Sequence, residues 1–84
     1  MKVIIRLFAA YRDKAGTGQF ELELPSGATV GQAARELVRC YPGIAHDALR
    51  LVAAVNQEYA DHNRVLKESD EVAFIPPVSG GSHD

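Results

Sequence analysis

The sequence lacks the features that would direct it to a membrane, to nucleic acid or to the cell exterior. It has no tryptophan and one cysteine, Cys40, so no internal disulfide can form, which agrees with a reducing compartment. No stretch approaches the roughly 20 apolar residues of a membrane span. The formal net charge is -2, with both signs interspersed, which predicts no basic surface for nucleic acid or an anionic membrane. We therefore expect a cytoplasmic protein.

Residues that could carry catalysis or bind a metal are also few. The histidines, His46, His62 and His83, share no i, i+4 spacing, so no zinc site is predicted. Cys40 lies in an expected helix and is interpreted as a partly buried structural thiol rather than a nucleophile. Gly16-Thr17-Gly18 is assigned to a hairpin turn rather than to a phosphate loop. The body of the chain therefore predicts no active site, no metal and no bound cofactor.

What the 84 residues do contain is a set of short strands in a chain long enough for one domain. Residues 3–8 are apolar on both faces, which predicts a central strand. Residues 9–15 are expected to form a short helical turn, and "QFELELP" alternates like a strand with one solvated face. Further strands are predicted at "LRLVAAVNQ", at 59–60 and at "EVAFIP", with turns at 56–58 and 68–70.

The clearest helix is "TVGQAARELVRCYPG". Thr29 and Gln32 have the spacing of a capping box at its start, and Pro42-Gly43 ends it. An apolar stripe at helical spacing gives it one buried face. The order of elements predicts an α+β fold, with a mixed sheet of about five strands and this main helix on one face. Placing the first and last strands side by side and parallel at the centre buries the two most apolar strands, which is the β-grasp, or ubiquitin-like, arrangement.

The chain closes with "PPVSGGSHD", which cannot pack into a core. We predict a β-grasp domain over 1–78 and a flexible tail over 79–84 that contains Gly80-Gly81. Pro76 and Pro77 favour an extended conformation and cannot donate sheet hydrogen bonds. A glycine pair lets a backbone thread a narrow channel and approach reactive groups closely. On composition alone, a terminus without function accounts for the tail equally well.

The stretch "AAVNQEYADHNRVLKESDEVAFIPPVSGG" resembles the MoaD-type small subunits of molybdopterin synthases, in the MoaD/ThiS sulfur-carrier family. The Ala-Val-Asn at a strand end and the Pro-Pro-Val-x-Gly-Gly approach carry the resemblance. Towards the N-terminus, "VIIRLFAAYRDKAG" and "SGATVGQAARELVRCYPG" also fit, so the resemblance covers Lys2 to Gly81. The C-terminal part is the specific part, since the helix alone does not discriminate.

The resemblance implies a sulfur carrier in molybdenum cofactor biosynthesis that reacts at its own C-terminus. A partner that resembles ubiquitin-activating enzymes, an adenylyltransferase, uses ATP to adenylate the carboxylate of Gly81. A persulfide sulfur donor then replaces the nucleotide, which leaves a thiocarboxylate. That end inserts into the large subunit of molybdopterin synthase and gives its sulfur to cyclic pyranopterin monophosphate. The chain itself is then a non-catalytic subunit, with the catalytic side chains on its partners.

Carried onto this sequence, the resemblance assigns a role to each residue of the tail and of its root. Gly81 bears the reacting carboxyl group and Gly80 permits access to it. The threaded tail is lined by Pro76, Pro77, Val78 and Ser79. An apolar docking patch is expected from Phe8, Phe74 and Ile75, although alternation along a strand prevents all three from sharing one face. Arg12 matches a basic position that looks important for contact with the activating enzyme, or else it is a solvated arginine. For Asn56 we predict a side-chain hydrogen bond that stabilises its turn.

One departure from the family bears on this assignment. In the family the second glycine is the last residue, whereas Ser82-His83-Asp84 follows here, so Gly81 has no free carboxylate to adenylate. A processing protease that removes the extension is the hypothesis we favour. The extension may instead be foreign to the natural chain, or the protein may not act as a sulfur carrier. Three other functions stay open: sulfur transfer for thiazole synthesis or tRNA thiolation, a ubiquitin-like protein modifier, and a binding module with a silent tail.

Overall fold

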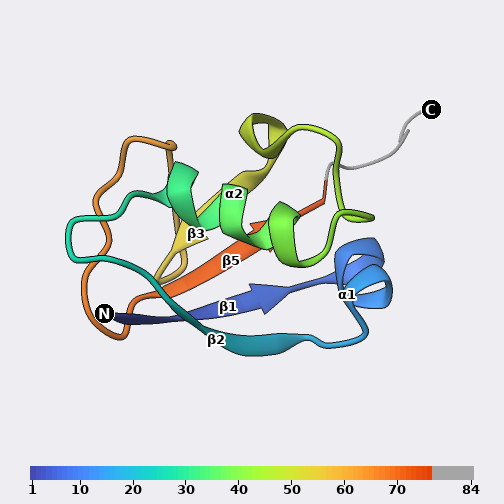
Figure 1. Cartoon of the computed structure of the whole chain (residues 1–84), viewed down its shortest axis with the longest axis horizontal. Helices are drawn as coiled ribbons and strands as arrows, with labels where there is room; N and C mark the ends of the chain where they lie inside the picture. The colour runs from blue at the N-terminus through green and yellow to red at the C-terminus, as the bar shows by residue number, and fades with distance from the viewer. Residues whose placement is uncertain (77–84) are drawn as a thin grey trace.

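A mixed five-stranded sheet organises the chain in the computed structural model, which describes residues 1–76 (Figure 1). Its strands are β1 (Lys2–Leu7), β2 (Gln19–Glu23), β3 (Val52–Val55), β4 (Glu58–Ala60) and β5 (Glu71–Ile75), in the spatial order β2-β1-β5-β3-β4. β5 runs parallel to β1 and antiparallel to β3. The predicted parallel pairing of the first and last strands is therefore confirmed, and so is the β-grasp fold.

Helix α2 (Val30–Cys40) lies across one face of the sheet (Figure 1). Its predicted capping box is present, because the Thr29 hydroxyl accepts from the Gln32 backbone N–H while the Gln32 side chain accepts from the Thr29 N–H. A short helix, α1 (Ala9–Ala15), joins β1 to β2, and a 3-10 turn, η1 (Ala48–Arg50), precedes β3. The chain thus has the expected main helix together with a second, shorter one.

The core lies between α2 and the inward side of the three inner strands. Alternate residues of β1 and β5 are fully buried there, and the same alternation leaves their neighbours half-exposed on the other side. The largest fully buried side chains are Phe74, Ile5, Leu7, Leu37, Val3, Val30, Val55 and Val72. Since α2 covers only this side, the sheet has a covered face and an open face.

Two local predictions were wrong. The strand predicted over "LRLVAAVNQ" shortens to Val52–Val55, because the Asp47 carboxylate accepts from the Leu49 N–H and begins η1 instead. Gly16 does not sit in a turn between strands but ends α1, in the left-handed conformation with φ 77° that favours glycine.

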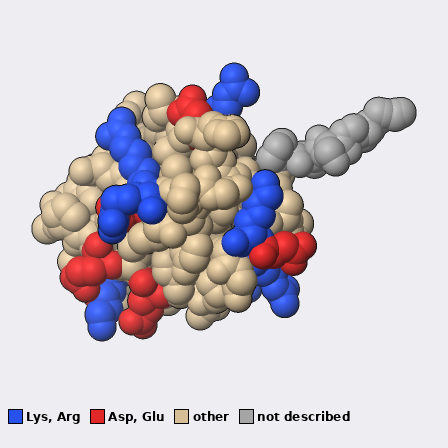
Figure 2. Space-filling view, turned by 45° about the vertical axis from the view of Figure 1, so that its right-hand side comes forward, with Lys and Arg blue, Asp and Glu red and all other residues tan. Residues whose placement is uncertain are grey.

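The surface and helices bear on two of the exclusions made from the sequence. Figure 2 shows Lys and Arg groups dispersed among Asp and Glu groups around a broad uncharged area on the side in view. Within residues 1–76, no helix has both the length and the apolar character needed to cross a membrane. Nor do three or more His, Cys, Asp or Glu residues of that range gather where they could hold a metal ion.

Candidate functional site

The end of β5 is the point from which the C-terminal residues leave the sheet. Ile75 is the last residue of β5, and its partner across the neighbouring strand is Val52. Pro76 follows outside the strand and is half-buried. At the same end of the sheet, β1 passes into α1 through Phe8 (Figure 1). Any partner that takes hold of the tail therefore meets the open face beside Ile75.

Four apolar or aromatic side chains surround that point, and we call them the open-face patch: Phe8, Val52, Tyr59 and Ile75. Phe8 is 41% exposed, Val52 45% and Tyr59 77%, while Ile75 is half-buried. Tyr59 pairs with Ala54, and Ala54 pairs with Ala73 of β5. Because residues directly opposite each other share a face, Tyr59 and the two alanines form one row, with small residues between larger ones. An exposed apolar patch on so small a domain marks an interaction surface.

A polar hollow lies within the patch. It has a volume of about 240 Å³ and is lined by Arg6, Phe8, Gln57, Glu71 and Ala73. Arg6 Nη1 donates to Glu71 Oε2 at 2.7 Å, and the Arg6 guanidinium carbon lies 5.6 Å from the centre of the Phe8 ring. The cation–π contact and the ion pair together hold the guanidinium against the sheet.

The position of β5 is held by a hydrogen-bonded clamp at its other end. Asn56 Nδ2 donates to Asp70 Oδ1 at 2.9 Å, and Asn56 Oδ1 accepts from the Glu71 N–H at 3.0 Å. Asp70 Oδ2 in turn accepts from the Lys67 N–H at 2.8 Å. Asn56 and Gln57 both have positive φ, 50° and 74°, as a two-residue hairpin turn requires. The predicted turn-stabilising bond of Asn56 is therefore confirmed, and it fixes the register of β5.

Phe74 and Cys40 differ from what the sequence predicted. Phe74 is fully buried against the core, because it alternates with the open-face residues of β5, so it cannot contact a partner directly. Cys40, expected to be partly buried, is exposed at the last residue of α2. Both errors concern which side of an element a residue faces.

Arg12 lies on α1 and is exposed. Its aliphatic stem packs over Gly18, where a Cβ would come within 3.4 Å of Arg12 Cδ. Arg12 forms no ion pair with the residues of the described range, so its charge is available to a partner. The remaining predicted site residues, Pro77, Val78, Ser79, Gly80 and Gly81, lie outside the described residues, and their roles stay predictions.

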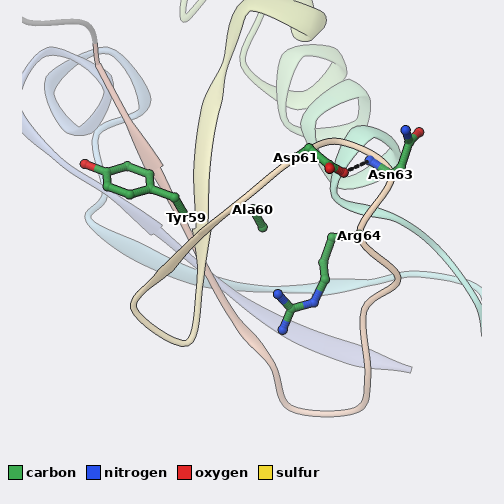
Figure 3. A pocket seen from close by; sticks show the side chains of 5 residues that line it. All are labelled: Tyr59, Ala60, Asp61, Asn63 and Arg64. Carbon is green, nitrogen blue, oxygen red and sulfur yellow. Dashed lines mark hydrogen bonds between the residues drawn. The ribbon is translucent and has the colours of Figure 1, made fainter.

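A second hollow, of about 420 Å³, lies beside the edge strand β4. Figure 3 shows the residues that line it, with Arg64 and Tyr59 on separate sides and Asp61 bound to Asn63. The Asp61 carboxylate accepts from the Asn63 N–H at 2.8 Å, which makes it part of a local turn. The hollow is open and holds no arrangement of nucleophile and base, so we assign it no catalytic role.

Two pKa shifts in the described range have structural causes rather than catalytic ones. Burial raises the pKa of the Tyr11 hydroxyl, since Tyr11 packs into the core from α1. A hydrogen bond from Arg39 lowers the pKa of Glu36, one turn away on the exposed side of α2. Neither group lies in the open-face patch, so the patch can bind a partner but has no acid or base poised for chemistry.

Sequence reasoning missed Val52, Tyr59 and the ion pair of Arg6 with Glu71. Their proximity depends on the register between strands that are 45 or more residues apart in several cases, and alternation within one strand does not give that register. The signal that could have found Tyr59 is a large aromatic in a short, polar edge strand, where a buried role is excluded.

Comparison with known proteins bears on the whole chain. The sequence model of the ThiS family matches residues 5–81. A molybdopterin synthase sulfur carrier subunit of Mycobacterium tuberculosis is 39% identical over 82 residues, which cover 96% of this chain and 99% of that protein. SAMP1, a small archaeal modifier protein from Haloferax volcanii, superposes with a TM-score of 0.83 at 29% identity, over 96% of this chain and all of that one.

A further solved structure resembles the fold alone, with a TM-score of 0.67 at 23% identity over 96% of this chain and 100% of that one. It comes from a complex of subunits 1 and 2 of the molybdopterin-converting factor of Helicobacter pylori.

Proposed function

The chain belongs to the ThiS family of MoaD/ThiS sulfur carriers, and from this premise we propose that it is the sulfur carrier subunit of a molybdopterin synthase. The observation that carries the proposal is the full-length similarity to proteins of that name, at 39% identity over 96% of the chain in Mycobacterium tuberculosis and 35% over the same share in Arabidopsis thaliana. A relative that matches from end to end shares the domain and the approach to its terminus.

In this proposal the chemistry takes place at Gly81. A carboxylate is a poor electrophile, so the adenylyltransferase partner uses ATP to convert the Gly81 carboxylate into an acyl-adenylate with a good leaving group. A persulfide sulfur then displaces the nucleotide and leaves a thiocarboxylate. The thiocarboxylate donates its sulfur to cyclic pyranopterin monophosphate in the large subunit. Gly80 has no side chain to obstruct the passage of this end through a channel.

The open-face patch supports a docking role for the folded body. Phe8 and Ile75 lie at the end of the sheet from which the tail departs, and Val52 and Tyr59 extend the apolar surface across two more strands. A partner that covers this patch holds the root of the tail at a fixed place. The large subunit is the proposed partner at this surface, and the activating enzyme is the proposed partner near Arg12.

The proposal requires removal of Ser82-His83-Asp84, because only then does Gly81 carry a carboxylate. The intact mass of the protein, isolated from its native cells during cofactor synthesis, tests this directly. The expected result is a species that ends at Gly81, part of it carrying the mass increment of sulfur in place of oxygen. A protein that still ends at Asp84 and carries no such increment would refute sulfur carriage at Gly81.

The acceptor of the sulfur is tested separately, by complementation. A strain without its molybdopterin synthase small subunit should regain molybdoenzyme activity when it expresses the chain ending at Gly81, and Gly81→Ala should abolish the rescue. Rescue of a thiazole or tRNA-thiolation defect in place of the molybdenum defect would keep the carrier chemistry and change its pathway.

A second candidate, a protein modifier, is favoured by the similarity to SAMP1 at a TM-score of 0.83. In that case the Gly81 carboxyl forms an isopeptide bond with lysines of other proteins. Blots of native cells against this protein should then show conjugates of high mass that disappear with Gly81→Ala. Their absence, together with rescue of the synthase defect, would exclude the modifier.

A further inference from the structure

The ion pair of Arg6 and Glu71 has hydrogen-bonding capacity that the domain does not use. Arg6 offers five N–H donors in a planar group, and its Nη1 donates to Glu71 Oε2. Its Nε is shielded from water and has no acceptor among the described residues. A buried donor without an acceptor is costly and calls for a reason. The pair also keeps the open end of the hollow polar within an apolar patch.

Docking at the open-face patch would remove this pair from water. The Arg6 side chain is 42% exposed and that of Glu71 29%, so both still gain hydration in the free protein. Burying a charged pair is unfavourable unless the partner supplies hydrogen bonds to the remaining donors and oxygens. An apolar partner surface over the hollow would therefore bind weakly, and the pair selects against it.

The charge balance of the pair defines what the partner must supply. Because Arg6 and Glu71 already neutralise each other, a further carboxylate would be repelled by Glu71 and a further ammonium group by Arg6. An uncharged group that carries both an acceptor and a donor meets both needs. An amide does so, since its carbonyl can accept from Arg6 and its N–H can donate to Glu71. Ala73, which lines the hollow without a long side chain, leaves room for such a group.

We propose that the hollow between Arg6, Phe8 and Glu71 receives an amide group, from a peptide bond or an Asn or Gln side chain, of the protein that docks on the open-face patch. The proposal rests on the proposed function, which supplies the docking event. It adds a specificity element to a surface that would otherwise recognise any apolar partner of suitable shape.

The test is calorimetric titration of the chain against the large synthase subunit of the same organism, in the full-length form or the form ending at Gly81, whichever binds more tightly. The double variant Arg6→Met/Glu71→Met should weaken binding by about 10- to 100-fold, because the partner's amide then has no hydrogen-bonding counterpart. If the pair needs nothing from the partner, replacing it by apolar side chains should leave binding unchanged or make it tighter, which would overturn the proposal.

Glu71→Gln distinguishes an amide from a charged group in the partner. With an amide, the variant should bind more weakly, because the Gln side chain presents N–H groups where the partner's own N–H needs an oxygen. With a partner carboxylate, the loss of repulsion should make binding tighter, and that result would also overturn the proposal.

A matched control is the pair of Lys2 and Glu21, whose Nζ and Oε1 lie 3.8 Å apart on the same sheet away from the hollow. Lys2→Met/Glu21→Met makes the same type of change and should leave the affinity within about twofold, as expected of an exposed pair. If the unaltered chain binds in neither form, the proposed function and this inference both fail. If it binds and the Arg6→Met/Glu71→Met variant binds equally well, only the inference fails.

Discussion

The two faces of β5 have opposite properties although they belong to one five-residue strand. On the covered face, Val72 and Phe74 are fully buried, whereas on the open face Glu71, Ala73 and Ile75 are half-exposed. The covered face consists of large apolar side chains under α2, and the open face mixes small, charged and apolar ones. The difference indicates that one face supplies stability and the other is available for recognition, and the predictions below test that division.

The largest expected effect is on the covered face. Phe74→Ala should lower the free energy of unfolding by about 3–5 kcal/mol, because it leaves a cavity under α2. Ile75→Ala, one residue further on, should cost about 1 kcal/mol or less. Urea denaturation of both variants measures the contrast. Equal losses from the two substitutions would mean that the faces do not differ in their contribution to stability.

The clamp that sets the register of β5 should have the next largest effect. Asn56→Ala removes the bonds to Asp70 and Glu71 and is expected to cost about 1–3 kcal/mol. Asn63→Ala, at an exposed loop position, is the matched control and should stay within about 0.5 kcal/mol. Thermal unfolding of the pair decides. An Asn56→Ala protein as stable as the control would leave the clamp without energetic importance.

On the open face the effect should appear in binding instead of stability. Ile75→Asp is expected to weaken association with the large subunit at least about 10-fold, because it places a charge in the open-face patch, while the domain stays folded. Leu49→Asp is the control, since Leu49 is 63% exposed on η1, which packs near α2. Calorimetry on both variants should separate them, and a similar affinity for the two would argue against docking at this patch.

The cap of α2 belongs to the covered layer, so its loss should affect stability alone. Thr29→Ala is expected to cost about 1 kcal/mol, whereas Thr29→Ser keeps the hydroxyl and should cost less. Affinity for the large subunit should be unchanged in both. A loss of affinity that exceeds the loss of stability would show that α2 takes part in docking.

The smallest effect concerns pH. Burial raises the pKa of Tyr11 in the folded state above its unfolded value. The stabilisation of its neutral form is therefore complete below the ordinary tyrosine pKa and is lost as the pH rises through the folded pKa. In unfolding experiments from neutral to alkaline pH, Tyr11→Phe should lose less stability with rising pH than the unaltered chain. Identical pH dependence of the two would contradict this.

The fold was predictable where local signals and apolarity agreed. The capping box at Thr29 and the Pro42-Gly43 stop bound α2 closely, and the apolar character of β1 and β5 placed them together. The 3-10 turn was missed, because one carboxylate, that of Asp47, decides it. Phe74 was assigned to the wrong face, since family resemblance gives position along the chain but not orientation across the sheet.

The candidate site was predictable only where it is continuous in sequence. The tail with Gly80-Gly81 and its root at Ile75 come from one stretch. Tyr59, Val52 and the pair of Arg6 and Glu71 meet across strands, and their proximity follows from the register that the sequence pattern leaves undetermined. Side chains that gather from separate strands therefore required the structure.

The central place of β5 also has a consequence for how the protein is made. β5 is the last strand of the chain, yet it fills the gap between β1 and β3. Its pairing with β1 joins residues at opposite ends of the sequence, so it forms late, after nearly the whole chain has left the ribosome. The sheet cannot close before the segment that leads to the tail is in place. A truncated or unfinished chain would lack its centre, so a stable molecule of this fold is one whose synthesis has reached the reactive end.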